Sequence, residues 1–448
     1  MCILNKMKRF IYIIGLFVVI LSTGCDKKES TTTTSSVAQL KSFAFASNDS
    51  MPGLEAAVFT VKERLDTGLV ENTDSIMYGT SLESVVPRFT FAATPGAAFV
   101  TTPDTVCTIT GYDTLDFSKR PIYLTIRSSD NTNTKTYEIQ AFVHQVDPDL
   151  YTWTQLTDKI YDPDDSEQQV VEMGDDFILF AYNGFAIHTY RSSDGITWTS
   201  NGAVTGLPAG TKVRQIISTG DTLYYGADST VYRSVNGTTW TAHKTPFNVQ
   251  TILLYWNNNV WALVDTAGYE LAIWRADSLA LTGLRPAGDF PISDFATVCF
   301  HSASTRERAM IIGGFADNGR SLNTRWNLEY STHPLPDGEY RMQEFSIDRP
   351  AFTSLTGVSV VEYNHQLLLF GGVDDKMNYF GRDILISEDE GLTWTKADTT
   401  KNQLPAVYQA RQKQTAVVRD NYIYVFGGQD TQKTYSDVYR GRLNSIDW

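Results

Sequence analysis

The chain has 448 residues, with 37 Lys and Arg against 51 Asp and Glu and a net charge of −14. This acidic balance disfavours binding to nucleic acid, and it disfavours adhesion to anionic lipid through charge alone. The length predicts at least two domains, although a propeller can absorb roughly 300 residues as one closed unit. Aromatic residues make up 12% of the chain, and long stretches with helical periodicity are missing, which favours an all-β fold with few helices.

Residues 1–24 have the pattern of an export signal. Lys6, Lys8 and Arg9 form a positive start, and an unbroken apolar run follows from residue 10 to residue 21. That run is too short to span a bilayer as a mature helix. We therefore expect residues 1–24 to be removed.

The signal ends in Leu21-Ser22-Thr23-Gly24-Cys25, where small residues precede a cysteine. This segment resembles the lipobox of bacterial lipoproteins, which implies lipidation of Cys25. It departs from that family at Ser22, where an aliphatic residue is usual. The alternative is an ordinary signal peptide followed by an incidental cysteine. We favour the lipoprotein because the apolar run, the small residues and the cysteine come in the right order.

After Cys25, residues 25–37 are polar and rich in Thr and Ser, which predicts a flexible tether. Removing the three basic residues of the signal leaves 34 bases against 51 acids, a net charge of −17. Membrane attachment should therefore come from the lipid. We expect a lipid-anchored protein of the cell envelope, in the outer membrane, although Asp26 beside the cysteine acts as an inner-membrane retention signal in some bacteria and as an export signal in others.

The cysteine pattern does not predict a disulfide framework, despite an oxidising compartment. Beyond Cys2 and Cys25, only Cys107 and Cys299 remain, and they fall in different predicted domains. Both stand in apolar strand contexts, so we interpret them as small core residues.

From residue 38 to residue 147 the chain alternates apolar and polar residues in about seven short runs, as in Ile122-Tyr-Leu-Thr-Ile126. This pattern predicts an immunoglobulin-like β-sandwich. The segment from Ser128 to Ile139 resembles the last hairpin of Ig-like spacer domains in secreted bacterial proteins. The resemblance implies a spacer role for this domain, and a binding role is the alternative.

Residues 148–448 contain a recurring motif, an aromatic or aliphatic residue followed by Arg-Ser or similar residues. Its second member falls at Arg191, Arg233, Arg275, Tyr330, Ile386 and Arg440. In each unit an apolar strand ending in small residues lies upstream, and in most units a polar turn precedes that strand. Four strands per unit and six units predict a six-bladed β-propeller.

Three segments of this region resemble the Asp box of sialidase-like propellers. Ser and Asp or Asn side chains would bond backbone amides there, Gly would take a positive φ, and Trp would pack between blades. We interpret these residues as structural: Ser192, Asp194, Gly195, Trp198; Ser234, Asn236, Gly237, Trp240; Ser387, Asp389, Gly391, Trp394.

The last three repeats also resemble kelch repeats of galactose-oxidase-like propellers, because the Gly pairs at 313–314, 371–372 and 427–428 end inner strands. The segment Tyr151–Leu156 looks like the outer strand of a repeat, and the last repeat stops at Trp448 without such a strand. We predict that residues 151–156 complete the sixth blade and join the first blade to the last.

No catalytic set is evident. The Arg triad and the acid and nucleophile pair of a sialidase are not identified. A kelch-type copper oxidase would need a Cys cross-linked to a Tyr and two His ligands. Cys299 and His301 fall on one face of a predicted strand, but no second Cys or ordered set of His accompanies them, so we interpret them as a satisfied core pair. The acidic run Asp162–Glu167 lacks the order of a calcium loop, so we interpret it as a solvated loop. No metal and no cofactor are predicted.

The loops between second and third strands are short in the first three repeats and long in the last three, where they should rim one mouth of the propeller. Aromatic, carboxylate and cationic side chains in such loops suit a carbohydrate or a protein partner equally well, and plain solvated loops are the alternative. The candidate ligand-binding residues are Arg320, Arg325, Trp326, Asp374, Lys376, Tyr379, Arg382 and Tyr435.

The whole chain resembles Gram-negative cell-envelope lipoproteins that join an N-terminal Ig-like domain to a kelch/Asp-box propeller. We therefore predict a non-catalytic lipoprotein whose propeller binds a glycan or a cell-surface protein. The alternative is a sialidase-like glycoside hydrolase. Carboxylates clustered with Arg at the propeller mouth would favour that alternative.

Overall fold

The computed structural model describes residues 34–444, apart from residues 52, 66, 110, 112, 163–166, 287–288, 303–305, 332–337 and 347–353. Cys25, the export signal and residues 25–33 lie outside the described residues. The described part consists of strands, loops and two single turns of 3₁₀ helix, η1 (Leu54–Ala56) and η2 (Val213–Gln215), so the all-β prediction is confirmed. No helix in this part is long and apolar enough to cross a membrane.

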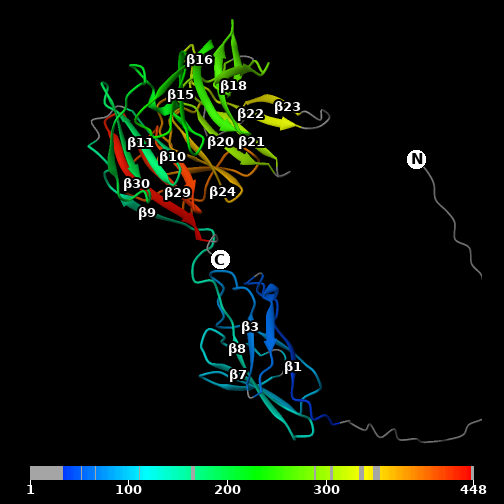
Figure 1. The fold of residues 1–448 in the computed structure, drawn as a ribbon. Helices are drawn as coiled ribbons and strands as arrows, with labels where there is room; N and C mark the ends of the chain where they lie inside the picture. The colour runs from blue at the N-terminus through cyan, green and yellow to red at the C-terminus, as the bar shows by residue number, and fades with distance from the viewer. Residues whose placement is uncertain are drawn as a thin grey trace, which may run out of the picture. The chain divides into compact units, whose positions relative to one another are not determined.

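The chain divides between His144 and Gln145 into two compact units, each drawn as a ribbon in Figure 1. The first unit contains eight strands: β1 (Leu40–Phe45), β2 (Phe59–Lys62), β3 (Thr67–Asn72), β4 (Pro87–Phe91), β5 (Ala97–Thr101), β6 (Val106–Thr108), β7 (Ile122–Arg127) and β8 (Thr134–Gln140). Strands β1 and β4 pair with each other, and the others form one sheet in the order β2-β3-β8-β7-β5-β6. In that sheet β3 runs parallel to β8.

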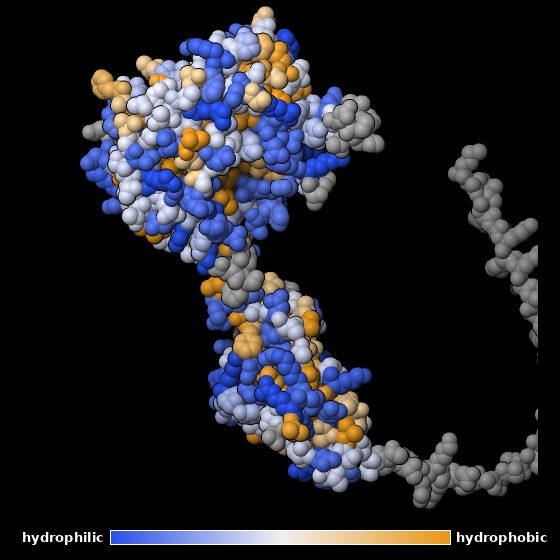
Figure 2. Space-filling view, viewed as in Figure 1, coloured by the Kyte–Doolittle hydropathy of each residue, from blue (hydrophilic) through white to orange (hydrophobic). Residues whose placement is uncertain are grey.

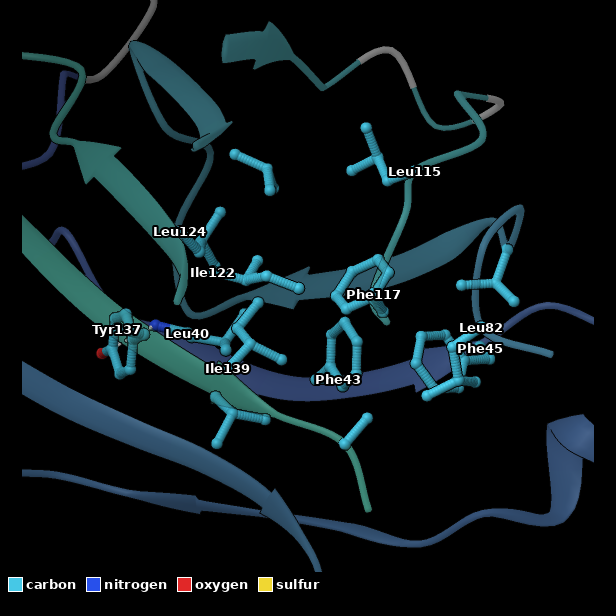
Figure 3. Close-up of a cluster of buried hydrophobic side chains, with 14 of the residues drawn as sticks. Leu40, Phe43, Phe45, Leu82, Leu115, Phe117, Ile122, Leu124, Tyr137 and Ile139 are labelled. Atoms are coloured by element: carbon cyan, nitrogen blue, oxygen red, sulfur yellow. Dashed lines mark hydrogen bonds between the residues drawn. The ribbon is translucent and has the colours of Figure 1, made fainter. Parts of the chain in front are cut away.

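The core of the first unit lies where the β1 side chains meet β7 and β8. Phe43 and Phe45 of β1 pack with Phe117, and Ile122, Leu124, Tyr137 and Ile139 extend the same cluster (Figure 3). The alternation of buried and exposed residues along β7 follows from the two-residue period of a strand. The Tyr137 hydroxyl accepts a hydrogen bond from the Leu40 amide (3.1 Å) and donates one to Glu63 (2.6 Å), which ties β8 to β1.

The described residues of the second unit form five hydrogen-bonded sheets. Their strands are β10 (Glu167–Met173), β11 (Asp176–Tyr182), β12 (Ile187–Ser192) and β13 (Thr199–Ala203); β14 (Ile217–Ser218), β15 (Leu223–Ser234), β16 (Thr241–Trp256), β17 (Asn259–Asp265), β18 (Tyr269–Arg275) and β19 (Ser278–Leu281); β20 (Ala296–His301), β21 (Glu307–Ile312), β22 (Thr324–Ser331) and β23 (Glu339–Ser346); β24 (Ser359–Tyr363), β25 (Gln366–Phe370), β26 (Ile384–Ser387) and β27 (Thr395–Lys396); and β28 (Thr415–Arg419), β29 (Tyr422–Gln429), β30 (Thr434–Leu443) and β9 (Tyr151–Thr157).

The second sheet has six strands because β16 serves two partners. Its first part pairs with β15, as in His243 with Val231, and its second part pairs with β17, as in Tyr255 with Val260. The recurring sequence motif lies on β12, β15, β18, β22, β26 and β30.

The first strand of the second unit pairs with its last strand. Strand β9 runs antiparallel to β30, with Gln155 opposite Tyr439 and Trp153 opposite Gly441, and the two lie side by side in Figure 1. This pairing confirms the prediction that residues 151–156 supply the outer strand of the last repeat. It satisfies backbone groups that would otherwise form an open edge.

Three turns of the second unit share one hydrogen-bonding pattern, and we call them the Ser-Asx turns (Ser192–Trp198, Ser234–Trp240 and Ser387–Trp394). The Ser hydroxyl accepts a bond from the Gly amide in each turn, at 2.9 Å in the first. Asp194 Oδ1 accepts bonds from two backbone amides at 2.8 Å, and Asn236 Oδ1 does the same at 3.0 and 2.9 Å. In the third turn, Asp389 accepts the Thr393 amide at 2.8 Å.

Each Ser-Asx turn packs against the sheet that precedes it around the unit. The Trp198 ring meets the edge of Phe426 from the last sheet, at 5.9 Å between centroids, and Trp240 meets Phe180 of the first sheet at 6.2 Å. Trp394 joins Met310 and Ile312 of the third sheet in one buried cluster. These side chains therefore act in packing between sheets.

Candidate functional site

The inner strands of the second unit surround a narrow cavity of about 120 Å³, which we call the axial cavity. It is lined from β10, β14, β16, β20, β24 and β28 by residues that include Gln169, Ile217, Leu253, Thr297, Val360 and Ala416. Strand register places the starts of inner strands beside the ends of their neighbours, as in Glu167 with Tyr182 and Ala296 with Ile312. The loops β21–β22 (313–323) and β25–β26 (371–383) therefore lie at the end where the inner strands begin, which we call the axial end.

Four charged side chains meet at the axial end, and we call them the axial cluster (Glu167, Arg214, Asp294 and Lys413). Arg214 Nε lies 3.6 Å from Asp294 Oδ1, and Lys413 Nζ lies 3.4 Å from Asp294 Oδ2. The Arg214 amide donates to Glu167 Oε1 at 3.2 Å, and its guanidinium donates to the Lys413 carbonyl at 2.7 Å. The four residues come from β10, η2 and the segments before β20 and β28.

The backbone at this cluster is strained. Asp294 has φ +50° and Lys413 has φ +59°, a left-handed conformation that disfavours residues with a Cβ. Each stands two residues before an inner strand, and Gly357 occupies the same place before β24 with φ +64°. The Lys413 amide donates to the Gly357 carbonyl (2.6 Å), and the Gly357 amide donates to the Asp294 carbonyl (3.0 Å). Strain of this kind is enriched at functional sites, so it supports a functional assignment.

Burial perturbs the charges of the cluster. The Arg214 side chain is only 9% exposed, and its Nε makes no hydrogen bond to any described residue. Burial lowers the pKa of the Arg214 guanidinium and raises the pKa of the Glu167 carboxyl, because both charged forms lose water. A carboxyl with a raised pKa beside cations in a cavity mouth is a candidate binding or proton-transfer group.

Glutamine side chains surround the axial cluster. Gln169 Oε1 accepts a bond from the Thr415 hydroxyl (3.2 Å), and Gln215 Nε2 donates to the Ile292 carbonyl (3.0 Å). Gln414 Nε2 donates to the Phe370 carbonyl (2.5 Å), while its buried Oε1 accepts no bond from the described residues. The axial end thus offers both donors and acceptors to a polar ligand.

Five of the predicted ligand-binding residues do lie in the axial-end loops. Arg320 is exposed and forms an ion pair with Asp289. Asp374 accepts the Lys376 amide at 2.9 Å, which shapes the β25–β26 loop, and the Lys376 side chain is exposed. Tyr379 and Arg382 are half-buried in the same loop.

The loop assignment of Arg325, Trp326 and Tyr435 is wrong. Arg325 and Trp326 lie within β22, are only 2% and 3% exposed, and pack against neighbouring sheets. Trp326 packs against Phe290 with the two rings tilted and their centroids 5.1 Å apart, and Arg325 donates to the Glu390 carbonyl. Tyr435 is buried in β30, because β29 and β30 extend to residues 429 and 434 and leave a short connection where a long loop was expected.

Two further sequence interpretations need correction. Glu167 is not part of a solvated loop, since it begins β10 and joins the axial cluster. His301 is not a core partner of Cys299, because its side chain is 67% exposed. Cys299 itself is half-buried, and burial raises the pKa of its thiol to about 12. Among the described residues, no group of three or more His, Cys, Asp or Glu side chains is arranged to hold a metal ion.

Comparisons with known proteins define the family. The DUF6242 beta propeller domain matches residues 147–448, and the DUF6242 N-terminal domain matches residues 24–141. The chain belongs to the DUF6242 family. The second unit of this DUF6242 protein is thus a β-propeller domain.

The solved structure of YjhT aligns with the DUF6242 chain at a TM-score of 0.45 and 13% identity, covering 63% of this chain and 96% of that one. No curated protein matches the sequence.

The axial cluster of the DUF6242 propeller was missed by sequence reasoning. Its members are far apart in the chain, and none stands in a known motif. One weak local signal exists, because a charged residue followed by Gln precedes or begins an inner strand at Glu167-Gln168, Arg214-Gln215 and Lys413-Gln414. This signal does not show that the residues meet, because they stand far apart in the chain and only the folded propeller brings them together.

Proposed function

We propose that this DUF6242 protein is a cell-envelope lipoprotein whose propeller binds a glycan, without catalysis, at the axial end. The observation that carries the proposal is the convergence of Glu167, Asp294 and Lys413 on Arg214, which also lines the axial cavity. Lipidation at Cys25, the tether 25–37 and an outer-membrane location are part of the proposal and rest on the sequence alone.

Within this proposal the propeller has six blades. The six inner strands that line the axial cavity and the six third strands that carry the repeated motif support that number. The six-stranded sheet would then hold two blades joined by β16. The Ser-Asx turns support the Asp-box relationship, and the two packed sheets of the first unit support an Ig-like spacer.

A glycan fits the axial end better than a protein partner. The axial end presents carboxylate acceptors, cationic donors and side-chain amides close together, which suits the many hydroxyls of a sugar. The face of the propeller seen in Figure 2 is mostly hydrophilic, with apolar residues between the hydrophilic ones. Large exposed apolar patches are the usual mark of protein docking.

The test is binding of the purified protein to an immobilised panel of bacterial and host glycans. We expect at least one glycan to bind, and we expect Arg214→Ala and Lys413→Ala each to weaken that binding at least tenfold. Lys62→Ala is the matched control, because this lysine forms its ion pair with Glu71 in the first unit. Binding that is unchanged in both axial variants would contradict the assignment.

A second candidate function is glycoside hydrolysis, because one observation favours it specifically. Carboxylates and an Arg do cluster at the propeller mouth, and burial raises the pKa of Glu167 while Asp294 stays paired with two cations. Two carboxyl groups in unlike environments are the usual acid and base pair of a glycosidase. Glu167 would protonate the leaving oxygen.

Hydrolysis and binding are separated by one measurement. Incubation of the protein with the bound glycan should leave the glycan intact if the function is binding alone. Release of reducing sugar that is abolished by Glu167→Gln would establish the hydrolase instead, provided that the variant still binds the glycan.

A further inference from the structure

An open groove of about 510 Å³ lies on the six-stranded sheet, away from the axial cluster. Its lining includes Thr219, Asp221, Tyr224, Tyr255, Asn258 and Trp274. Thr219 and Asp221 belong to the turn after β14, whereas Arg214 stands before that strand. The groove is therefore at the opposite end of the inner strands from the axial cluster, and we call it the aromatic groove.

Three aromatic rings from three strands form the apolar part of the groove. Tyr224 comes from β15, Tyr255 from β16 and Trp274 from β18. Tyr224 and Trp274 are buried, whereas Tyr255 is 38% exposed. Two of the rings therefore form a fixed wall of the groove, and the third is accessible to a ligand.

Neighbouring side chains hold the buried rings in place. The Arg233 guanidinium lies 5.6 Å from the Tyr224 ring centroid and is itself paired with Asp277 at 2.7 Å. His243 meets the edge of Trp274 at 5.8 Å between centroids. A wall that is rigid before binding lowers the entropy lost on binding.

The rim of the groove is polar. Asp221 and Asn258 are exposed and stand on two adjacent turns. Thr219 donates to Asp221 Oδ1 at 3.2 Å, and the Tyr255 hydroxyl lies 3.4 Å from Asn258 Oδ1. A carboxylate, an amide and two hydroxyls thus surround an aromatic face.

We propose that the aromatic groove is a second carbohydrate-binding site, specific for a neutral oligosaccharide. The C–H face of a sugar ring packs on an aromatic face, and its hydroxyls then meet acceptors and donors at the rim. Asp221 is the one charged residue in the described lining, so an acidic sugar would meet repulsion and find no cation. An open groove, unlike the recessed axial cavity, leaves room for a chain of several sugar units.

The site is independent of the axial cluster, because the two share no residue and lie at opposite ends of the inner strands. Loss of one should leave the other intact. This separation allows the experiment to distinguish failure of this proposal from failure of the proposed axial function.

The test is isothermal titration calorimetry, in which the heat of binding is measured as a neutral hexasaccharide is added to the protein. The hexasaccharides are cellohexaose, laminarihexaose, mannohexaose and xylohexaose. We expect at least one to bind. Tyr255→Ala should weaken that binding at least tenfold, and Asp221→Ala about fivefold. Tyr78→Ala removes a comparably exposed tyrosine from the other unit and should bind as the unchanged protein does. Lys413→Ala tests the axial end and should also leave hexasaccharide binding unchanged.

Three outcomes would overturn the proposal: no hexasaccharide binds, Tyr255→Ala binds normally, or Lys413→Ala abolishes the binding. A near-ultraviolet circular dichroism spectrum of each variant shows whether it has kept its fold. If Tyr255→Ala alters the packing, Asp221→Ala still tests the groove, because Asp221 is exposed in a turn and its substitution should leave the fold intact.

Discussion

Arg411 donates two hydrogen bonds to Asp437, at 2.5 and 3.1 Å, inside the propeller domain. The Tyr408 and Tyr435 rings lie 4.2 and 3.7 Å from the guanidinium carbon. Arg411 is fully buried, and its direct bonds to Asp437 join the segment before β28 to β30. The arrangement explains why Tyr435 packs inward.

We predict that Arg411→Met destabilises the protein by about 3 to 5 kcal/mol, because the Asp437 carboxylate is left buried and unpaired. Urea unfolding followed by circular dichroism measures the change. The double variant Arg411→Met/Asp437→Leu should lose less stability than the single variant, since no charge then remains buried. A double variant less stable than the single one would refute this explanation.

Closure by β9 can be tested at Gly441. A Cβ at this glycine would lie 2.4 Å from the Trp153 ring, so Gly441→Ala must displace the indole. We expect a loss of about 1 to 3 kcal/mol from overpacking. In a Trp153→Ala background, the same change should have little effect. Equal effects in both backgrounds would show that β9 does not pack on β30 in solution.

The Ser-Asx turns provide a matched comparison, because Asn236 does in one turn what Asp194 does in another. Asp194→Asn keeps the acceptor oxygen, and Asp194→Ala removes it. We expect Asp194→Ala to be less stable by about 1 kcal/mol per lost hydrogen bond at pH 7, and Asp194→Asn to be affected much less. Thermal unfolding of both variants measures the difference.

Asp194 should also make the free energy of unfolding depend on pH in the acid range. Backbone hydrogen bonds from Thr197 and Ile196 lower the pKa of Asp194. The stabilisation that they give is present above the ordinary pKa and is lost as the pH falls through the lowered one. The small loss of stability in Asp194→Asn at neutral pH should therefore disappear in strong acid. A difference that persists there would point to another cause.

Glu167 should show the opposite dependence. Its folded pKa is raised by burial, so the folded state binds more protons than the unfolded state between the ordinary and the raised pKa, and stability falls as the pH rises through that interval. Glu167→Gln removes this loss and keeps an acceptor for the Arg214 amide. We expect the stability of the variant, relative to that of the unchanged protein, to be greater at pH 7.5 than at pH 4. Urea unfolding at both pH values measures this difference. The same difference in unfolding free energy at the two pH values would contradict a raised pKa.

A substitution at Lys413 tests whether the left-handed backbone conformation of this residue serves binding and not stability. A left-handed conformation costs a residue with a Cβ about 1 to 2 kcal/mol, and Lys413→Gly removes that cost. The same substitution also removes the ion pair with Asp294. We expect unfolding free energy to stay the same or rise by about 1 kcal/mol, while glycan binding at the axial end falls. Gly357→Ala at the equivalent place should destabilise instead, because its Cβ would meet Gln412 at 3.0 Å. A Lys413→Gly variant that loses several kcal/mol would show a structural role.

The repeat pattern could be found from sequence because strands, turns and apolar alternation are local properties. The pairing of β9 with β30 was also predictable, since Thr152-Trp153-Thr154 repeats the outer-strand pattern that follows the Ser-Asx turns. The loop residues were harder. Arg325 and Trp326 follow a long loop, and nothing local shows that β22 has already begun at Thr324. Burial of Arg325 depends on Glu390, which is supplied by another sheet.

Strands in repeated units, and the strand that joins the two ends of the propeller, could be predicted from the sequence because each follows from patterns a few residues long. Which polar side chains meet depends on the tertiary structure. Glu167, Arg214, Asp294 and Lys413 come from segments that are distant in the chain, and the arrangement of sheets around an axis brings them within hydrogen-bonding or ion-pairing distance. Their burial, and so the shifted pKa of Glu167, exists only once those sheets have packed.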